Sequence, residues 1–203
     1  MKQRRFFRFF LILICFVIFF TLAKFKTVQA QELPQDIAIA AIVEPWLYLE
    51  VSPFMIDLEP DLVAADGSFN VGISSDIFLK VGTSNSEGWY LKIQGRNNGL
   101  KSLSTDYTIS SISGTSALAA GTDGYGANAT STLEGVFIGE LYDYYGSDIV
   151  GELVNEYRVL ASMASGHAIS EVVKMQIKAA ASIMAPADSD YADIIIVTIT
   201  PTI

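Results

Sequence analysis

After residue 36 the chain is built from short runs in which β-branched or aromatic residues alternate with polar ones. Residues 89–94 show this most clearly, because Trp89, Leu91 and Ile93 share one side of an extended chain and alternate with Tyr, Lys and Gln. Comparable apolar runs predict further strands over residues 37–51, 69–81, 169–181 and 191–200. Gly, Asn and Ser cluster between these runs, as they do in turns.

Three shorter signals refine this pattern. The Asn-Asn-Gly run at residues 97–99 is typical of a hairpin turn, and the glycines of residues 121–126 predict another turn. Apolar and acidic residues have helical spacing over residues 148–156, so a short helix is an alternative there. Many short strands with turns between them predict an all-β fold. We expect an antiparallel β-sandwich, immunoglobulin-like or jelly-roll-like, formed by residues 31–203 as a single domain.

The first 30 residues differ in kind from the rest. Four basic residues within the first eight precede an apolar run over residues 9–23, and Val28 and Ala30 follow as small or β-branched side chains. This order predicts a secretory signal peptide, residues 1–30, with a helical apolar part and cleavage after Ala30. A retained membrane anchor is the alternative, but about 15 apolar residues are fewer than the ~20 that span a bilayer. We therefore expect a protein that is secreted or held at the cell surface or cell wall.

Cleavage changes the charge balance. The leader holds six of the 13 basic residues and none of the 22 acidic ones, so the mature chain has seven bases and a net charge of about −15. Such a charge keeps an exported protein in solution and repels nucleic acid, whose phosphates need Lys and Arg partners. We expect no nucleic acid partner and no membrane contact after cleavage. The only cysteine, Cys15, leaves with the leader, so the domain must be held by its core.

Several segments of the mature chain resemble known proteins. They are residues 88–93, 97–100, 121–126 and 187–201. Together these segments resemble secreted bacterial β-sandwich surface domains, loosely those of WxL-type, spore-coat-U-type and fimbrial, pilin-like proteins. The resemblance covers roughly residues 70–203 and implies a non-enzymatic wall, pilus or coat role. The chain lacks the Trp-x-Leu signatures and the cysteines of these groups.

Catalytic chemistry is weakly represented. His167 is the only histidine, and no Gly-x-Ser-x-Gly motif accompanies it. One histidine and no mature cysteine do not make a zinc site of the usual kind. Acidic residues are so numerous that no glycosidase pair stands out. We predict that the protein is not an enzyme, with no catalytic, cofactor-binding or metal-ligating residues and no cofactor.

Calcium is the one metal for which the residues offer ligands. Asp57, Glu59 and Asp61 alternate as oxygen donors do, and Asp188 and Asp190 form a second group. The full twelve-residue calcium-loop pattern is absent. We therefore expect solvated acidic loops and a fold that does not need calcium.

Aromatic residues suggest a binding surface. Tyr142, Tyr144 and Tyr145 lie in a segment with Asp and Gly, so they are the best surface candidates for a sugar-stacking platform. The other large aromatics of the strands are expected in the core; they are Trp46, Tyr48, Trp89 and Tyr90. Asn128-Ala129-Thr130 fits the acceptor pattern for N-glycosylation.

These observations lead to two functional hypotheses. The first is an exported, non-enzymatic structural subunit of a cell surface or of a pilus-like or coat-like fibre. The second is a secreted carbohydrate- or cell-wall-binding module. For the first, residues 37–43 alternate so that they can add as a strand to the sheet of a neighbouring copy. The alternative is that residues 37–43 form the domain's own first strand.

Overall fold

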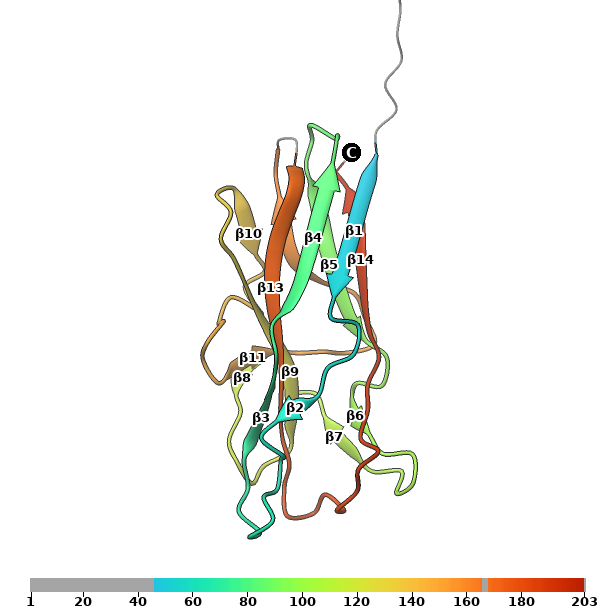
Figure 1. Ribbon diagram of the computed structural model, residues 1–203, viewed down its shortest axis with the longest axis vertical. Coiled ribbons are helices and arrows are strands. Elements are labelled where there is room, and N and C mark those ends of the chain that lie inside the picture. Colours follow the sequence, from blue (N-terminus) through green and yellow to red (C-terminus); the bar gives the residue numbers. More distant parts are fainter. Residues whose placement is uncertain (1–45, 166–167, 203) are drawn as a thin grey trace, which may run out of the picture. The chain divides into compact units, whose positions relative to one another are not determined.

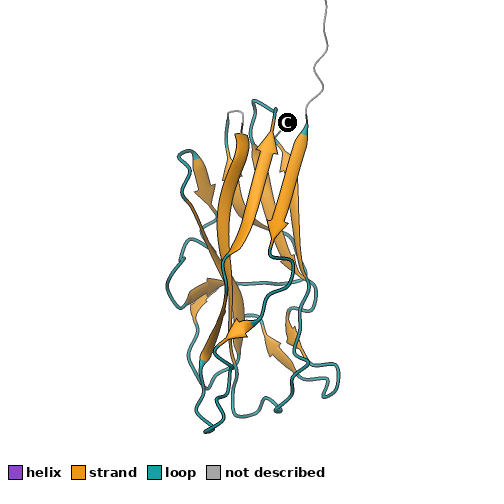
Figure 2. Cartoon of the chain, viewed as in Figure 1, coloured by secondary structure: helices purple, strands orange, loops and turns teal. Residues whose placement is uncertain are grey.

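The computed structural model describes residues 46–165 and 168–202 (Figure 1). All regular secondary structure within these ranges is β-strand, and loops connect the strands (Figure 2). The predicted all-β sandwich is therefore confirmed. The predicted signal peptide, the segment 37–43 and His167 lie outside the described residues.

Within the described residues the larger sheet has eight strands. Six follow one another across it in the order β1 (Leu47–Ser52), β4 (Ile77–Thr83), β13 (Ala168–Ala180), β9 (Gly124–Ser131), β11 (Ile149–Gly151) and β8 (Thr115–Ala117). The remaining two are β2 (Leu58–Glu59) and β3 (Val71–Ser74). β2 pairs with β3, which pairs with β13 beyond the start of β4.

The smaller sheet packs against the upper part of the larger one (Figure 1). Its four strands follow the order β10 (Val136–Ile138), β12 (Arg158–Met163), β5 (Trp89–Gly95) and β14 (Ile195–Pro201). A separate antiparallel pair joins β6 (Gly99–Lys101) to β7 (Thr108–Ser110). Every ladder between the named strands is antiparallel, as the short connections predict.

Side chains from both sheets meet in one main hydrophobic core. On β5, Trp89, Leu91 and Ile93 are fully buried, and Leu79 and Val81 of β4 meet them from the larger sheet. The alternation predicted for residues 89–94 is therefore confirmed. Full burial of an aliphatic or aromatic side chain contributes about 1.5–3 kcal/mol, so these central strands supply much of the stability of the fold.

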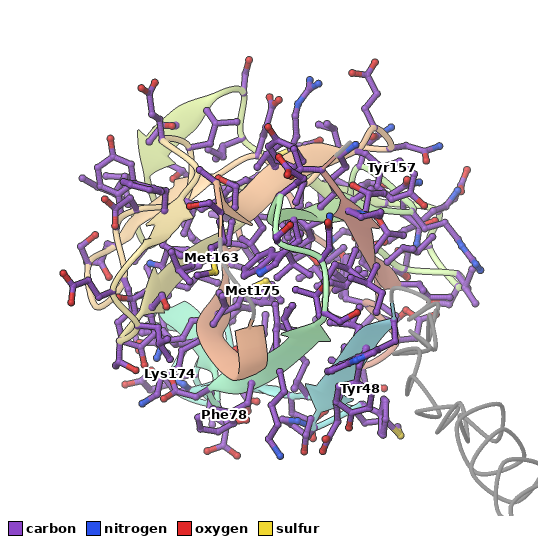
Figure 3. The ribbon with its side chains drawn as sticks, turned by 90° about the horizontal axis from the view of Figure 1, so that it is seen from above. Tyr48, Phe78, Tyr157, Met163, Lys174 and Met175 are labelled. Atoms are coloured by element: carbon purple, nitrogen blue, oxygen red, sulfur yellow. The ribbon has the colours of Figure 1, made fainter. Side chains whose placement is uncertain are left out.

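β13 is the longest strand and forms ladders with β4, β3 and β9. Its side chains alternate between the core and the outer face of the larger sheet. Figure 3 shows Met175 inside, near Met163 of the smaller sheet, whereas Lys174 points outward beside Phe78. The Lys174 ammonium lies 5.5 Å from the centre of the Phe78 ring and 3.7 Å from a carboxylate oxygen of Asp76. At this place the outer face of the larger sheet therefore holds an aromatic ring beside an ion pair.

Three local expectations differ from the structure in whole or in part. Residues 148–156 contain strand β11, because their backbone pairs with β8 and β9 instead of bonding within a helix. The glycine-rich residues 121–126 include the start of β9, where a Cβ on Gly126 would lie 2.5 Å from the Gly151 carbonyl oxygen. Glycine is needed there for close approach of two strands, which is distinct from its role in turns. The turn at residues 97–99 leads from β5 to β6, and these two strands do not form a hairpin.

Candidate assembly edge

β1 and β14 are the outer strands of the two sheets on one side of the sandwich. They lie next to each other, but within the described residues no β-ladder joins them (Figure 1). On the opposite side the chain passes directly from β9 to β10 through residues 132–135, which connects the two sheets. We call the unconnected side the β1–β14 seam. Its inward-facing apolar side chains are Leu49, Val51, Ile195, Val197 and Ile199.

The seam covers the core less completely than the strands behind it. Leu91 of β5 is fully buried, whereas Ile199 of β14, its cross-strand partner, is only partly buried. The same contrast separates Ile93 from its partner Val197. Apolar surface that stays in contact with water retains about 25 cal/mol per Å² of driving force for burial. A further strand laid along the seam would recover part of that free energy.

The outer strands of the described sheets differ in length and charge. β8 and β10 have three residues each and β2 has two, so they offer little backbone for pairing. β1 has six residues and β14 has seven. β14 carries no charged residue, and only Pro201 at its end interrupts the row of backbone N–H groups. Long edges without charge are the ones that add further strands.

β1 is protected by a polar cluster on its outer face. The Lys80 ammonium lies 3.3 Å from one Glu50 oxygen, and the Tyr48 hydroxyl donates to the other at 2.5 Å. The hydrogen bond from Tyr48 and the contacts with Lys80 lower the pKa of Glu50, which is therefore charged at neutral pH. The same bond to Glu50 raises the pKa of Tyr48. A charge on an edge strand opposes pairing, so β14 is the better acceptor of the two.

The turn between β4 and β5 binds both ends of the described chain. The backbone N–H of Trp46 donates to the Ser84 hydroxyl at 2.9 Å, and the N–H of Ser84 donates to the Trp46 carbonyl at 3.2 Å. The Asn85 side-chain amide donates to the Thr202 carbonyl at 2.8 Å, and the N–H of Thr202 donates to the Gly88 carbonyl at 3.1 Å. Residues 84–88 therefore fix β1 and β14 in place at the same end of the seam.

Asp193 fixes the chain just before β14. Its Oδ1 accepts hydrogen bonds from the N–H groups of Asn97 at 3.0 Å and Ile194 at 2.8 Å, and Tyr125 donates to Oδ2 at 3.3 Å. Burial raises the pKa of Asp193, and these hydrogen bonds oppose the rise. Burial also raises the pKa of Tyr125. Because these hydrogen bonds order the backbone before β14 and satisfy a buried core tyrosine, we assign the cluster a structural role.

The acidic residues considered as calcium ligands do not converge. Asp57, Glu59 and Asp61 are exposed, and no group of His, Cys, Asp and Glu in the described part of the chain is arranged to hold a metal ion. Asp190 accepts hydrogen bonds from two backbone N–H groups of the β6–β7 loop, and the Ser104 hydroxyl donates to Asp188. These two carboxylates therefore order a loop.

The three tyrosines predicted to form a platform point in different directions. Tyr142 is fully buried, and its hydroxyl donates to the Glu152 carbonyl at 2.8 Å. The Tyr145 hydroxyl donates to Asp76 at 2.5 Å, and burial together with this contact raises the pKa of Tyr145 to about 12. Of the three, only Tyr144 is exposed, at 36%. The prediction of a surface platform from these residues was wrong, because two of them serve the fold.

Four aromatic residues of the strands were expected in the core. Trp89 is buried as predicted, whereas Trp46, Tyr48 and Tyr90 are 41–48% exposed. The expectation that these three lie in the core was wrong. Tyr90 lies on the outer face of the smaller sheet, because the inner positions of β5 alternate with it. Phe137 of β10 is 65% exposed and lies on the same face, with one strand between the two rings.

Asn128 of the predicted glycosylation acceptor is fully buried in β9. Its amide nitrogen lies 3.1 Å from each of three backbone carbonyl oxygens, those of Tyr144, Ser147 and Ile149. A sugar on this nitrogen would displace the loop that covers it. The folded domain therefore does not present Asn128 as a glycosylation site.

Sequence reasoning placed a strand over residues 191–200 but did not identify it as the unpaired edge. The signal was present, because residues 194–203 contain no charge. Lys178 also gives no local signal, because it occupies an outward position of a strand, yet the structure buries this residue near Asn128. Nothing in the local sequence shows that a loop will cover that face.

Comparisons of the chain with protein-family models, with curated proteins and with solved structures find no match. Within the described residues there is no helix long and apolar enough to cross a membrane. The assignment of a function therefore depends on the geometry and chemistry of the domain.

Proposed function

We propose that this protein is an exported, non-enzymatic structural subunit of a cell surface or of a pilus-like or coat-like fibre. The observation that carries the proposal is the long, uncharged edge of β14 beside a core that the β1–β14 seam covers incompletely. In the assembly, residues 37–43 of one copy pair with β14 of the next copy. The protein is secreted or held in the cell wall.

The donor segment and the acceptor strand agree in length and chemistry. Each has seven residues, which is about 23 Å of extended chain, and neither carries a charge. Ile37, Ile39, Ala41 and Val43 form one row of side chains, which would contact the partly buried apolar residues of the seam. Backbone hydrogen bonds would supply affinity and the alternate side chains would supply register.

Charge favours contact at this place over others. The mature chain carries about −15, so two copies repel each other over most of their surface. The described part of the seam holds one acid, Glu50, which Lys80 compensates at 3.3 Å. Two copies therefore meet with least repulsion where an uncharged segment faces the uncharged strand β14.

The contact is head-to-tail, because the donor and the acceptor are different parts of the chain. Such interfaces close into rings or continue as fibres, depending on the rotation between neighbours. A structural subunit needs such a repeated contact, and strand addition of this kind would supply one.

Light scattering coupled to size-exclusion chromatography, followed by electron microscopy, tests the proposal. The exported protein should form oligomers or filaments. Ile39→Asp should yield a folded monomer, because a charge enters the row that contacts the seam. Ala40→Asp is the matched control, since the same charge lies in the opposite row, and it should still assemble. A wild-type protein that stays monomeric at high concentration would overturn the proposal.

Deletion of residues 31–43 separates the proposal from its main alternative. If the segment serves a neighbour, circular dichroism should show a folded, monomeric sandwich with an unchanged melting temperature. If the segment is the domain's own first strand, the deletion should unfold or strongly destabilise the protein. The second result would remove the basis for strand addition between copies.

A carbohydrate- or cell-wall-binding role is the second candidate, and exposed aromatics favour it. Tyr90 and Phe137 lie on the same outer face of the smaller sheet, and aromatic rings of this kind stack on sugars. A pull-down with cell-wall glycans should then retain the wild-type protein and lose Tyr90→Ala. Tyr144→Ala, on a different surface, serves as the control.

A further inference from the structure

A buried lysine and a buried asparagine lie near each other on the outer face of the larger sheet. Lys178 of β13 is 2% exposed and Asn128 of β9 is fully buried. In the ladder between these strands Lys178 is opposite Gly126 and Asn128 is opposite Gln176, so Lys178 and Asn128 are diagonal neighbours. Diagonal neighbours are within reach of a long side chain. Gly126 leaves the position opposite Lys178 without a side chain.

Both side chains donate to one oxygen atom. The Lys178 nitrogen lies 2.7 Å from the Ser147 carbonyl oxygen, and the Asn128 amide nitrogen lies 3.1 Å from the same oxygen. Because both nitrogens contact the same oxygen, the distance between them is at most the sum of the two contact distances, 2.7 Å and 3.1 Å. The carbonyl oxygens of Tyr144 and Ile149 also lie 3.1 Å from the Asn128 nitrogen, so two amide protons serve three acceptors.

The site holds a cation without a compensating acid. Within the described residues no carboxylate forms an ion pair with Lys178. Burial lowers the pKa of Lys178 and so favours the free amine. The negative charge of Asp148 acts in the opposite direction and raises this pKa, but by less. A buried ammonium without an ion pair is costly. Asn128 Oδ1 is also buried and accepts no hydrogen bond from the described residues. Such groups in a folded protein call for an explanation.

We propose that Lys178 and Asn128 form a self-modification site, at which the two side chains become joined by an isopeptide bond. The free amine of Lys178 attacks Cγ of Asn128, and a bond forms between Nζ and Cγ. The bond between Cγ and Nδ2 breaks. One proton of the attacking amine passes to Nδ2, which leaves as ammonia, so the reaction needs no oxidant, reductant or cofactor.

The surroundings suit this reaction. The three carbonyl oxygens around Nδ2 that now accept its protons would equally hold the departing ammonia. The remaining proton on Nζ keeps its hydrogen bond to Ser147. The product is a neutral amide that cannot take up a proton, so after the reaction no ammonium group needs to be buried at this site. Burial of both groups keeps water away from the reacting atoms.

The bond would close a covalent loop from residue 128 to residue 178. This loop contains β10, β11 and β12. The bond would link β9 covalently to its neighbour β13 near the centre of the larger sheet. The inference is independent of assembly, because the site lies away from the β1–β14 seam.

Peptide mapping by mass spectrometry on the full chain, purified and denatured, tests the proposal. A single branched peptide should contain both Asn128 and Lys178 and weigh less than the two linear peptides together by one ammonia. Mapping is needed because intact mass alone is ambiguous. Gln31, when it becomes the new N-terminus, and the Asn98-Gly99 pair both lose ammonia by cyclisation.

Two arginine variants provide matched controls. Lys178→Arg keeps a positive charge but has no attacking amine, so the branched peptide should disappear. Lys174→Arg changes a partly exposed lysine of the same strand face, and the branched peptide should remain. Linear peptides with unmodified Lys178 and Asn128 in the folded wild-type protein would overturn the proposal. This result does not depend on whether either variant folds or whether the protein assembles.

Discussion

β5 and β14 are neighbours in one ladder and carry similar apolar patterns, yet they differ in what surrounds them. Leu91 and Ile93 of β5 are fully buried, while Ile199 and Val197, directly opposite on β14, remain partly exposed. The side chains do not cause this difference, because all four are large aliphatic residues. It arises because β5 has a strand on each side and β14 has one. Position in the sheet thus decides which apolar strand is fully buried and which keeps part of its apolar surface exposed.

Of the substitutions that test this comparison, Leu91→Ala should change the free energy of unfolding most. The substitution leaves a cavity in a fully packed site, so the free energy of unfolding of the monomer should fall by about 2–5 kcal/mol. Urea denaturation followed by circular dichroism measures it. A loss below about 1 kcal/mol would contradict the assignment of β5 to the centre of the core.

Ile199→Ala is the matched substitution on β14 and should cost less. Part of the side chain is already in water, so the same measurement should show a loss of about 1–2 kcal/mol. Equal losses for Leu91→Ala and Ile199→Ala would mean that the seam is as well covered as the centre. The contrast between the two strands would then be wrong.

Thr198→Lys should separate stability from assembly. Thr198 faces away from the core but lies opposite Lys92 on β5, so repulsion between the two ammonium groups should lower the free energy of unfolding by no more than about 1 kcal/mol. A lysine on an edge strand opposes pairing, and light scattering should therefore show loss of oligomers. Oligomers that survive Thr198→Lys would argue against β14 as the acceptor.

Asp193→Asn should have a smaller and pH-dependent effect. The pKa of Asp193 is raised in the folded state, so the folded protein binds this proton more tightly than the unfolded chain does. This contribution to stability is present at low pH and is lost as pH rises through the raised pKa. Urea denaturation at several pH values should show that the free energy of unfolding of the wild type falls relative to that of the variant as pH rises through this interval. A constant difference across pH would contradict the raised pKa.

Removal of calcium should have no effect. The acids of residues 57–61 are exposed, and in the part of the chain that the structure describes no acidic group is arranged around a metal position. Excess EDTA should leave the melting temperature unchanged, because only an ion bound to the folded state stabilises it by mass action. A fall of several degrees on adding EDTA would contradict this expectation.

The central strands of the fold were predictable from sequence, because alternation reports directly on a strand with one buried face. Residues 89–94 and 169–181 show it, and both form long strands. Residues 121–126 misled the prediction because glycine is common both in turns and where two strands approach closely. The choice at Gly126 depends on Gly151, which lies far away in sequence.

The candidate edge was only half predictable. The sequence indicates that residues 191–200 form an uncharged strand, but its exposure follows from strand order, which local patterns do not encode. Burial of Lys178 was not predictable either. Its side chain alternates with the core row as a surface residue would, and it is covered by a loop whose path depends on hydrogen bonds to Asn128.

The attachment of Trp46 and Thr202 to the same five-residue turn has a mechanical consequence. Tension applied between these two residues would first load the few hydrogen bonds to residues 84–88. It would then peel β1 and β14 from their neighbours one bond at a time, whereas the ladders of β13 would carry no load until later. Bonds broken in succession yield at lower force than bonds loaded together. A fibre of such subunits would therefore stretch by opening at the seam. The core between the inner strands β13 and β5 would stay folded, and the edge strands could pair with it again when the tension is released.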